Sequence, residues 1–437
     1  MSTQATACWQ PDEERMDRQD LEQLQLERLE ATLSRVHRNV PFYRRRFDEV
    51  GFDPDELRSL EDLHRLPFTT KADLTDSYPY ALFAVPLRDV VRLHASGGTG
   101  TAAIVMGYTR NDIKNWSNLM ARMLVAGGVT KDDVVQITFD YGLLTGAFGV
   151  HYGAERLGAS VIPISSGNTK RQVKIMQDYK TTTLIGTPSY ALHIAQTMFE
   201  MGVNPNALSL RHALLGGEPW SDELRRRIED ELNVTATDNY SLSEVMGPGI
   251  AGECLDRSGL HVNEDHFLVE IVDPETLEPV PAGTTGELVI TTLSKEAFPL
   301  IRYRTRDVTS IVPGPCPCGR TSIRMRRMER RTDDMLVVKG VTVHPSAVEA
   351  VLRAIEGTEP AYQIVLDRHG VLDEATVLVA VSESMFFDEM KLQTEFREKV
   401  KRRLASELGV SFEVKLVDRK TLQNAAAQGK VVDRRQR

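Results

Sequence analysis

The sequence has few cysteines, no excess of positive charge and no long apolar run. Only four of its 437 residues are cysteine, at positions Cys8, Cys254, Cys316 and Cys318, which is too few for a fold that depends on disulfides. The 62 acidic side chains outnumber the 53 basic ones and give a formal charge of −9. This balance argues against a general nucleic-acid binder, because such proteins gather Lys and Arg to neutralise phosphates.

No stretch reaches the roughly 18 uncharged apolar residues that a membrane helix needs. Residues 1–20 carry acids instead of a basic segment followed by an apolar run, so they do not resemble a secretory signal. We therefore expect a folded cytoplasmic protein with no membrane partner and no nucleic-acid partner. Its length fits about three domains, or one large and one small domain.

The middle of the chain alternates short β-rich runs with helix-like stretches. The β-rich runs at 134–138, 161–164, 182–185 and 212–215, with helices such as 112–126 and 221–232 among them, predict βαβ units and a largely parallel sheet. Strands at 267–271 and 287–291 predict a β-rich subdomain. Nearer the start, the spacing of Leu26, Leu29, Leu33, Val36 and Val40 predicts an amphipathic helix that ends at Pro41.

The pattern begins again after residue 331. It reads as a strand at 335–343, a helix at 345–355, strands at 362–366 and 376–381, a helix at 388–408 and a strand at 412–417, which is the ferredoxin-like order. We therefore expect an α/β protein with two domains. Residues 1–330 would form a large N-terminal domain of mixed and parallel sheets with helices and the β-rich subdomain. Residues 331–437 would form a small ferredoxin-like α+β domain.

A run rich in glycine and hydroxyl side chains lies between two short expected strands. It consists of Ser96, Gly97, Gly98, Thr99, Gly100 and Thr101. Because glycine lets the backbone come close to a ligand, such a run can present several N–H groups to a polyphosphate. A flexible hairpin turn is the alternative. The run is not the usual P-loop, since the Gly-Lys-Ser/Thr ending is missing.

Two further segments carry residues suited to a nucleotide. Residues 238–249 combine Tyr240 with hydroxyl groups and Glu244, and such a set can stack a base and hold Mg²⁺. A plain polar loop is the alternative. Asp307, which follows the basic residues of 303–306, can accept the hydroxyls of a ribose or can belong to a surface ion pair.

Two charged segments lie at and beyond the expected domain boundary. Residues 330–334 and 339–340 could act at the boundary or could be a solvated linker. Lys430 could neutralise charge on a reacting phosphate or could only increase solubility.

The order of these segments resembles the adenylate-forming enzymes, and most of all the phenylacetate–CoA ligase family. The likeness runs nearly end to end, and although each short run is weak alone, the ordered set is specific. The runs are Trp9–Pro11, Val40–Arg44, Leu66–Lys71, Tyr78–Tyr80, His94–Gly100, Gly107–Thr109, His151–Glu155, Gly217–Trp220, Tyr240–Glu244, Arg302–Asp307, Arg331–Asp334 and Gly340–Ser346. The resemblance implies that an acid attacks the α-phosphate of Mg·ATP, giving an acyl-adenylate and pyrophosphate, and that the thiol of coenzyme A then displaces AMP.

The resemblance also implies roles for individual residues. Lys430 and Glu244 would be catalytic, with Lys430 at the α-phosphate and Glu244 holding Mg²⁺. Asp333 and Asp334 would form a hinge for the small domain, and Gly340 would line the CoA tunnel. The acid would lie against Tyr141, Gly142, Phe148, Tyr152 and Tyr190. ATP and AMP would contact Ser96, Gly97, Gly98, Thr99, Gly100, Thr101, Gly216, Gly217, Glu218, Pro219, Asp238, Asn239, Tyr240, Ser241, Asp307 and Arg331.

Aromatic rings and glycines at the acid positions suit a flat aryl acid, although ordinary core packing explains the rings equally. The partners that we expect are therefore an aryl carboxylic acid and coenzyme A, with a homodimer left open.

Three positions depart from the pattern that the family usually has. Thr101 stands where a Lys is frequent, Ser241 replaces a Gly, and residues 426–434 keep Lys430 but little else of the usual C-terminal run. Two alternatives to an aryl-acid–CoA ligase therefore stay open. One is an enzyme that loads the adenylate onto a carrier protein, and the other is a nucleotide-binding scaffold that has lost catalysis.

Three of the four cysteines fall in the β-rich part of the chain together with a histidine. Cys254, His261, Cys316 and Cys318 make a Cys₃His set, which is common in structural zinc sites. Three buried thiols are the alternative, because Cys-x-Cys is a less usual pairing than Cys-x-x-Cys. The family resemblance favours zinc, so the expected cofactors are ATP, Mg²⁺, coenzyme A and a structural Zn²⁺.

Replacing Lys430 by alanine tests its first-step role. Removing a fixed charge from a developing anion costs about 100-fold or more in rate, so Lys430→Ala should lower acid-dependent ATP–pyrophosphate exchange by that factor. Thioester formation from a supplied acyl-adenylate should stay within about threefold of the wild type. Lys420→Ala, in the same tail, serves as the control. Adenylation at the wild-type rate with loss of thioester formation would contradict the assignment.

Overall fold

A nine-stranded mixed sheet forms the centre of the first part of the chain. The computed structural model describes residues 7–96, 103–328, 330–332, 336–338, 341–343, 345–369, 372–381, 390–417, 422 and 431–435. The chain divides into two compact units, Met1–Ser96 with Ile104–Thr332, and a second built mainly from Asp333–Arg437. In sheet order the nine strands are β13 Ile311–Val312, β14 Arg324–Met325, β9 Leu260–Val262, β8 Gly247–Glu253, β7 Thr235–Leu242, β6 His212–Gly216, β5 Thr183–Gly186, β3 Val134–Ile137 and β4 Ser160–Ile162.

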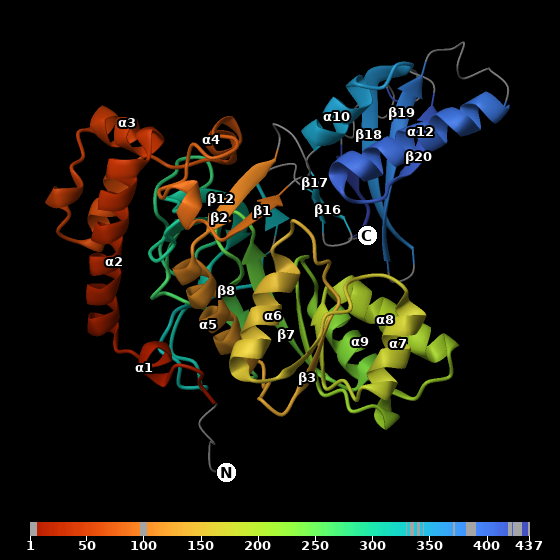
Figure 1. Ribbon diagram of the computed structural model, residues 1–437, viewed down its shortest axis with the longest axis horizontal. Coiled ribbons are helices and arrows are strands. Elements are labelled where there is room, and N and C mark those ends of the chain that lie inside the picture. Colours follow the sequence, from red (N-terminus) through yellow and green to blue (C-terminus); the bar gives the residue numbers. More distant parts are fainter. Residues whose placement is uncertain are drawn as a thin grey trace. The chain divides into compact units, whose positions relative to one another are not determined.

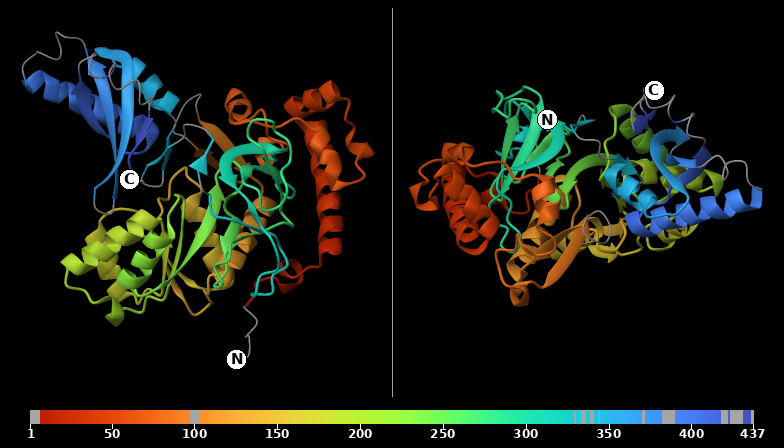
Figure 2. Two further views of the ribbon diagram at one scale, coloured as in Figure 1. Left: turned by 180° about the vertical axis from the view of Figure 1, so that it is seen from behind. Right: turned by 90° about the horizontal axis from the view of Figure 1, so that it is seen from above.

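The chain reverses its direction of winding at β3. It first steps outward from β3 to β4, then returns across β3 to β5, and continues through β6 to β7, all in parallel. Because such crossovers are right-handed, the helix between β3 and β4 lies on one face and the next three helices lie on the other. Figure 1 shows this arrangement, with α5 and α6 on one side of the strands and α7, α8 and α9 on the opposite side, and Figure 2 (left) shows it from behind. The predicted parallel βαβ core is confirmed.

Antiparallel strands complete the first unit. A four-stranded sheet in the order β10-β11-β12-β15 forms the expected β-rich part, and β1 and β2 pair as a separate ribbon. The bounds of these strands are β10 Phe267–Val272, β11 Gly286–Thr292, β12 Tyr303–Thr309, β15 Arg330–Arg331, β1 Arg92–Ser96 and β2 Ile104–Tyr108.

The helices of the first unit begin and end at recognisable caps. The helix predicted around Leu29 and Leu33 buries both side chains completely, and Pro41 begins the next helix after the first has ended at Asn39. Thr109 and Asp112 cap α5 reciprocally through hydrogen bonds of 3.0 and 2.9 Å. The bounds are α1 Pro11–Glu14, α2 Arg18–Asn39, α3 Pro41–Val50, η1 Pro54–Glu56, η2 Leu60–Arg65, α4 Lys71–Asp76, η3 Leu87–Asp89, α5 Arg110–Ala126, α6 Gly146–Leu157, α7 Thr169–Asp178, α8 Pro188–Glu200, η4 Pro205–Ala207 and α9 Asp222–Leu232.

The second unit has a four-stranded sheet in the order β20-β19-β18-β21 with its own apolar core. The single strand predicted at 335–343 is wrong in detail, because these residues contain two short strands, β16 and β17, that pair as a separate antiparallel ribbon. β21, which the sequence pattern did not reveal, lies parallel to β18. The bounds are β16 Leu336–Val338, β17 Val341–Val343, α10 Pro345–Arg353, β18 Thr358–His369, β19 Leu372–Val381, α12 Met390–Leu408, β20 Glu413–Val417 and β21 Val431–Asp433.

The predicted α/β class, with a mixed sheet, helices and a smaller β-containing C-terminal unit, is confirmed. Within the described residues, none of the helices combines the length and the apolar character that crossing a bilayer requires.

One lysine lies in the core of the first unit. Lys295, in the loop after β11, is 2% exposed, and its Nζ lies 3.0 Å from the ring centroid of Tyr108 and 3.9 Å from Sδ of Met246. Burial lowers the pKa of Lys295 to about 7, against an opposing effect of Asp112. The face of an aromatic ring attracts a cation but does not replace its hydration.

The stability of the protein should therefore depend on pH through Lys295. The folded-state pKa lies below the unfolded one, so the unfolded chain binds more protons between about pH 7 and 10, and this residue makes stability rise with pH in that window. We expect Lys295→Met to remove up to about 1.4 kcal/mol per pH unit of that rise, measured by urea unfolding at pH 7.0 and 9.5. Lys114→Met, at an exposed position of α5, is the control. An unchanged slope in Lys295→Met would contradict the inference.

Candidate functional site

Loops with unusual polar and aromatic content follow the carboxyl ends of β3, β5, β6 and β7. In doubly wound sheets ligands bind at this edge, beside the strand where the winding reverses, because neighbouring loops diverge there. The reversal lies at β3 and β5. Most of the described candidate residues fall in these loops or next to them.

The loop after β6 approaches β7 closely. A Cβ on Gly216 would lie 2.3 Å from the carbonyl oxygen of Asn239, and Gly217 has a φ of +82°, so both positions favour glycine. Oε1 of Glu218 accepts a hydrogen bond of 2.6 Å from the backbone N–H of Ser189, in the first turn of α8. The candidate adenine loop, Gly216–Pro219, is thus hydrogen-bonded to the first turn of α8, the helix that follows β5.

Asp238 is a buried acid beside this loop. Burial raises its pKa to about 7, and the carboxylate of Glu253 adds to the shift, while Arg327 opposes it. The backbone N–H of Asp238 donates to Glu253 over 2.8 Å, and Glu253 is paired with Arg225. Asp238 therefore lies next to the buried ion pair of Glu253 and Arg225.

Tyr240, Asp307 and Arg331 come together from three strands. The hydroxyl of Tyr240 donates to Oδ2 of Asp307 over 2.6 Å, and Arg331 forms an ion pair with Oδ1 of the same carboxylate. Arg331 also donates to the carbonyl of Thr305 over 2.8 Å. Burial raises the pKa of the Tyr240 hydroxyl well above its usual value, with the Asp307 charge adding to the shift, so the hydroxyl keeps its proton. Asp307 is thereby held in one orientation.

Glu244 and Ser96 also meet. The hydroxyl of Ser96, at the end of β1, donates to Oε1 of Glu244 over 3.1 Å, and the Nζ of Lys71 lies 3.7 Å from the same oxygen. Glu244 is 5% exposed. Sequence reasoning assigned no chemistry to Lys71, although it ends one of the resembling runs, because nothing in the spacing shows that the first residue of α4 reaches a residue so distant along the chain.

Three of the aromatic residues expected at the acid form one cluster on α6 and the loop before it. The rings of Tyr141 and Phe148 meet edge to face at 5.2 Å, and Phe148 is stacked on Tyr152 at 6.4 Å. The sequence did not point to Arg92. Its Cζ lies 5.0 Å from the ring centroid of Phe148 and 4.7 Å from that of Tyr152. The guanidinium also donates to the Tyr152 hydroxyl over 2.6 Å. Gly142 is exposed on the same loop. Tyr190, on α8, has a hydroxyl that donates to the carbonyl of Gly167 over 3.3 Å, and its place at the acid stays a prediction.

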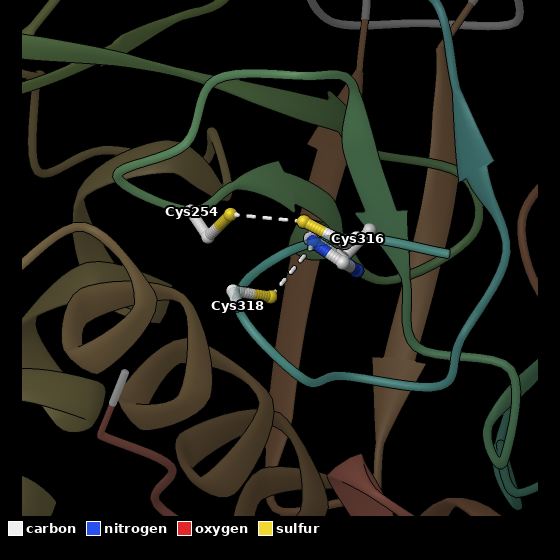
Figure 3. A group of neighbouring side chains, drawn as sticks. Cys254, Cys316 and Cys318 are labelled. Carbon is white, nitrogen blue, oxygen red and sulfur yellow. Dashed lines mark hydrogen bonds between the residues drawn. The ribbon is translucent and has the colours of Figure 1, made fainter. Parts of the chain in front are cut away.

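The predicted Cys₃His group also comes together. Cys254 follows β8, His261 lies in β9, and Cys316 and Cys318 lie in the turn after β13. The ligand atoms of these four buried residues all lie within 4.8 Å of one another, with 3.7 Å between the sulfurs of Cys254 and Cys316 and 3.4 Å from the sulfur of Cys318 to Nε2 of His261. Figure 3 shows the sulfurs of the three cysteines turned toward a common centre. The donor set and its spacing fit a tetrahedral Zn²⁺.

Ser241 lies in β7 next to Tyr240, and nine other predicted site residues lie outside the described residues. They are Gly97, Gly98, Thr99, Gly100, Thr101, Asp333, Asp334, Gly340 and Lys430.

Comparisons with known proteins agree with the motifs. Residues 85–294 match the family model described as AMP-binding enzyme, and residues 340–435 match that of the AMP-binding enzyme C-terminal domain. The chain is 46% identical over 422 residues to a phenylacetate–coenzyme A ligase of Thermus thermophilus, with 94% of this chain and 95% of that protein covered. It is 45% identical to a phenylacetate–coenzyme A ligase of Escherichia coli over 91% of each chain.

The comparison with solved structures agrees with the sequence comparisons. A crystal structure of 2-hydroxyisobutyryl-CoA ligase, in complex with 2-HIB-AMP and CoA, has a TM-score of 0.93 and 30% identity, covering 98% of this chain and 92% of that one. The resemblance read from the ordered motifs is confirmed: the chain belongs to the phenylacetate–CoA ligase family of adenylate-forming acid–thiol ligases.

Proposed function

We propose that this chain activates an aryl carboxylic acid of the phenylacetate type with ATP and transfers the acyl group to coenzyme A. The observation that carries the proposal is that two groups of side chains follow or end the parallel strands of one mixed sheet: the aromatic cluster after β3, and Tyr240 of β7 with its partner Asp307. In the first step a carboxylate oxygen bonds to the α-phosphorus and pyrophosphate leaves. In the second the thiol sulfur bonds to the acyl carbon, AMP leaves, and the thiol proton passes to solvent.

Asp307 is suited to the ribose. Its carboxylate is oriented by Tyr240 and Arg331, and a carboxylate is an acceptor that suits the paired hydroxyls of a ribose. Because both partners fix the carboxylate in advance, it need not reorient when the nucleotide binds. The backbone of Gly216 pairs with that of Asn239, so the loop that begins there lies beside the strand that carries Tyr240. The loop Gly216–Pro219 and the Tyr240 ring would then form two sides of an adenine pocket.

Glu244 is suited to the metal that accompanies ATP. It offers buried carboxylate oxygens, which Mg²⁺ prefers together with phosphate oxygens. Mg²⁺ bound there would neutralise charge on the pyrophosphate that leaves. Ser96 orients the carboxylate, and Lys71 adds a positive charge next to it. The charge of Lys71 matters because the chain has Thr101 at a position where the family frequently has a lysine.

The cluster of Tyr141, Phe148 and Tyr152 is suited to the acid. Flat rings that meet edge to face or in stacks present apolar faces to a planar ligand. Burial raises the pKa of the Tyr141 hydroxyl, which also contacts Nδ1 of His151 at 3.1 Å. The hydroxyl is therefore neutral and its ring is held in place. Such a pocket favours an aryl group over a short aliphatic one.

We also propose that Cys254, His261, Cys316 and Cys318 hold a structural Zn²⁺. Four protein ligands leave no open position for a substrate. Nδ1 of His261 contacts Oγ of Ser322 at 3.2 Å, which orients the imidazole so that Nε2 faces the sulfurs. The role would be to join β8 and β9 to the turn after β13.

A panel of acids tests the proposed activity. With Mg·ATP at pH 8, we expect ATP–pyrophosphate exchange to be fastest with phenylacetate or a related aryl acid and at least tenfold slower with 2-hydroxyisobutyrate, because the aromatic cluster favours flat rings. Glu244→Gln should lower exchange by about 10- to 100-fold. Added coenzyme A should then give the thioester. Absence of exchange with every aryl acid would contradict the proposal, and adenylation without any CoA thioester would favour a carrier protein as acceptor.

Elemental analysis tests the metal site. Protein purified without chelator should contain about one Zn²⁺ per chain, and the double variant Cys316→Ser/Cys318→Ser should lose it, because two of four ligands are removed. Cys8→Ser is the matched control, since Cys8 is not among the four clustered residues, and should keep its metal. Wild-type protein that contains no zinc would overturn the proposal.

A further inference from the structure

One face of strand β1 contacts three different parts of the site. Side chains two residues apart point to the same face of a strand, so Arg92, His94 and Ser96 share one face. Arg92 reaches the aromatic cluster through Tyr152, and Ser96 reaches Glu244. His94, between them, has no role in any step described so far.

His94 binds the loop that carries Tyr141. Its Nδ1 lies 3.0 Å from the carbonyl oxygen of Leu143, and the backbone N–H of Ala95 donates to the same oxygen over 2.9 Å. A carbonyl oxygen only accepts, so Nδ1 carries the proton. Burial lowers the pKa of His94 to about 4, and the ring is therefore neutral at neutral pH. Two adjacent residues of β1 thus hold one carbonyl of the acid-binding loop.

The ring of His94 cannot turn away from this bond. It is 2% exposed and lies edge to face against Tyr108 and Trp116, with centroid distances of 5.5 and 5.9 Å. Its centroid is 5.6 Å from that of Phe148, a member of the aromatic cluster. Among the residues that the structure describes, Nε2 has no hydrogen-bond partner. The structure therefore keeps a buried imidazole whose one satisfied polar atom is the one that holds Leu143.

We propose that His94 is a positioning residue for adenylation, which ties the acid-binding loop to the strand that ends at Ser96 and so sets the acid's carboxylate at a fixed spacing from the α-phosphate. The inference rests on the proposed function. It follows from the geometry because a misplacement of about 1 Å between reacting groups costs on the order of 100-fold in rate. A residue that ties the acid-binding loop to the strand whose last residue, Ser96, contacts Glu244 controls that spacing without touching either substrate.

Two amide variants of His94 separate the hydrogen bond from simple packing. In His94→Asn the side-chain NH₂ occupies nearly the place of Nδ1 and can still donate to Leu143, whereas in His94→Gln it lies one bond further out, near the place of Nε2. Both substitutions keep a polar side chain of similar size. We expect His94→Gln to raise KM for the acid at least tenfold and to lower kcat for exchange at least tenfold, with KM for ATP within twofold of the wild type. His94→Asn should recover most of both losses.

Leu93→Ala is the matched control, because Leu93 is on the opposite face of the same strand and is 40% exposed. It should leave all three constants unchanged. Thermal unfolding identifies any variant that is not folded, and the comparison of Asn with Gln uses only folded protein. Equal defects in Asn and Gln, parallel changes in both KM values, or wild-type kinetics in Gln would overturn the role of His94. Absence of exchange in the wild type with any acid would instead overturn the proposed function.

Discussion

The return of the chain from β4 across β3 to β5 reverses the winding of the sheet. This reversal is the constraint on which the position of the site depends. Had the chain continued past β4, the loops at the carboxyl edge would all cross the sheet in the same direction and cover one another. Because it returns across β3, the loop leading to α6 and the loop leading to α8 go to opposite faces of the sheet. The candidate acid residues Tyr141, Phe148 and Tyr152 lie on the first of these loops and on α6. The topology of the sheet therefore determines where these side chains are placed.

Around this edge, charged groups are held in fixed orientations. Asp307 is fixed between a phenol and a guanidinium, Glu244 between a hydroxyl and an ammonium group, and Glu218 accepts from the backbone of α8. A polar site that is already oriented does not need to reorganise as charge moves during the reaction, which is the main source of electrostatic stabilisation in enzymes.

The sequence revealed the parallel core through a local signal, the alternation of β-rich runs and helices. It revealed the Cys₃His group because these residue types have a known coordination preference, which applies even to positions far apart in the chain. It did not reveal contacts that depend on how distant segments pack. Lys71 next to Glu244, Arg92 over the aromatic cluster and His94 on Leu143 join residues with no shared pattern. Nor did the sequence reveal that the hydroxyl of Tyr190, on α8, donates to the carbonyl of Gly167. The single strand predicted at 335–343 differs from the ribbon of β16 and β17, because an apolar run does not show where it folds back.

The cysteine group has a consequence for the conformational entropy of the chain. Cys254 and Cys316 are 62 residues apart, and the segment between them contains β10, β11 and the whole of β12 with Asp307. An ion that joins the two ends turns this segment into a closed loop, which removes many configurations of the unfolded chain but few of the folded one. If the four residues hold an ion, metal affinity and the resistance of β12 to local opening would be two measures of one free energy. The cysteine group would then govern how long the carboxylate of Asp307 stays in place.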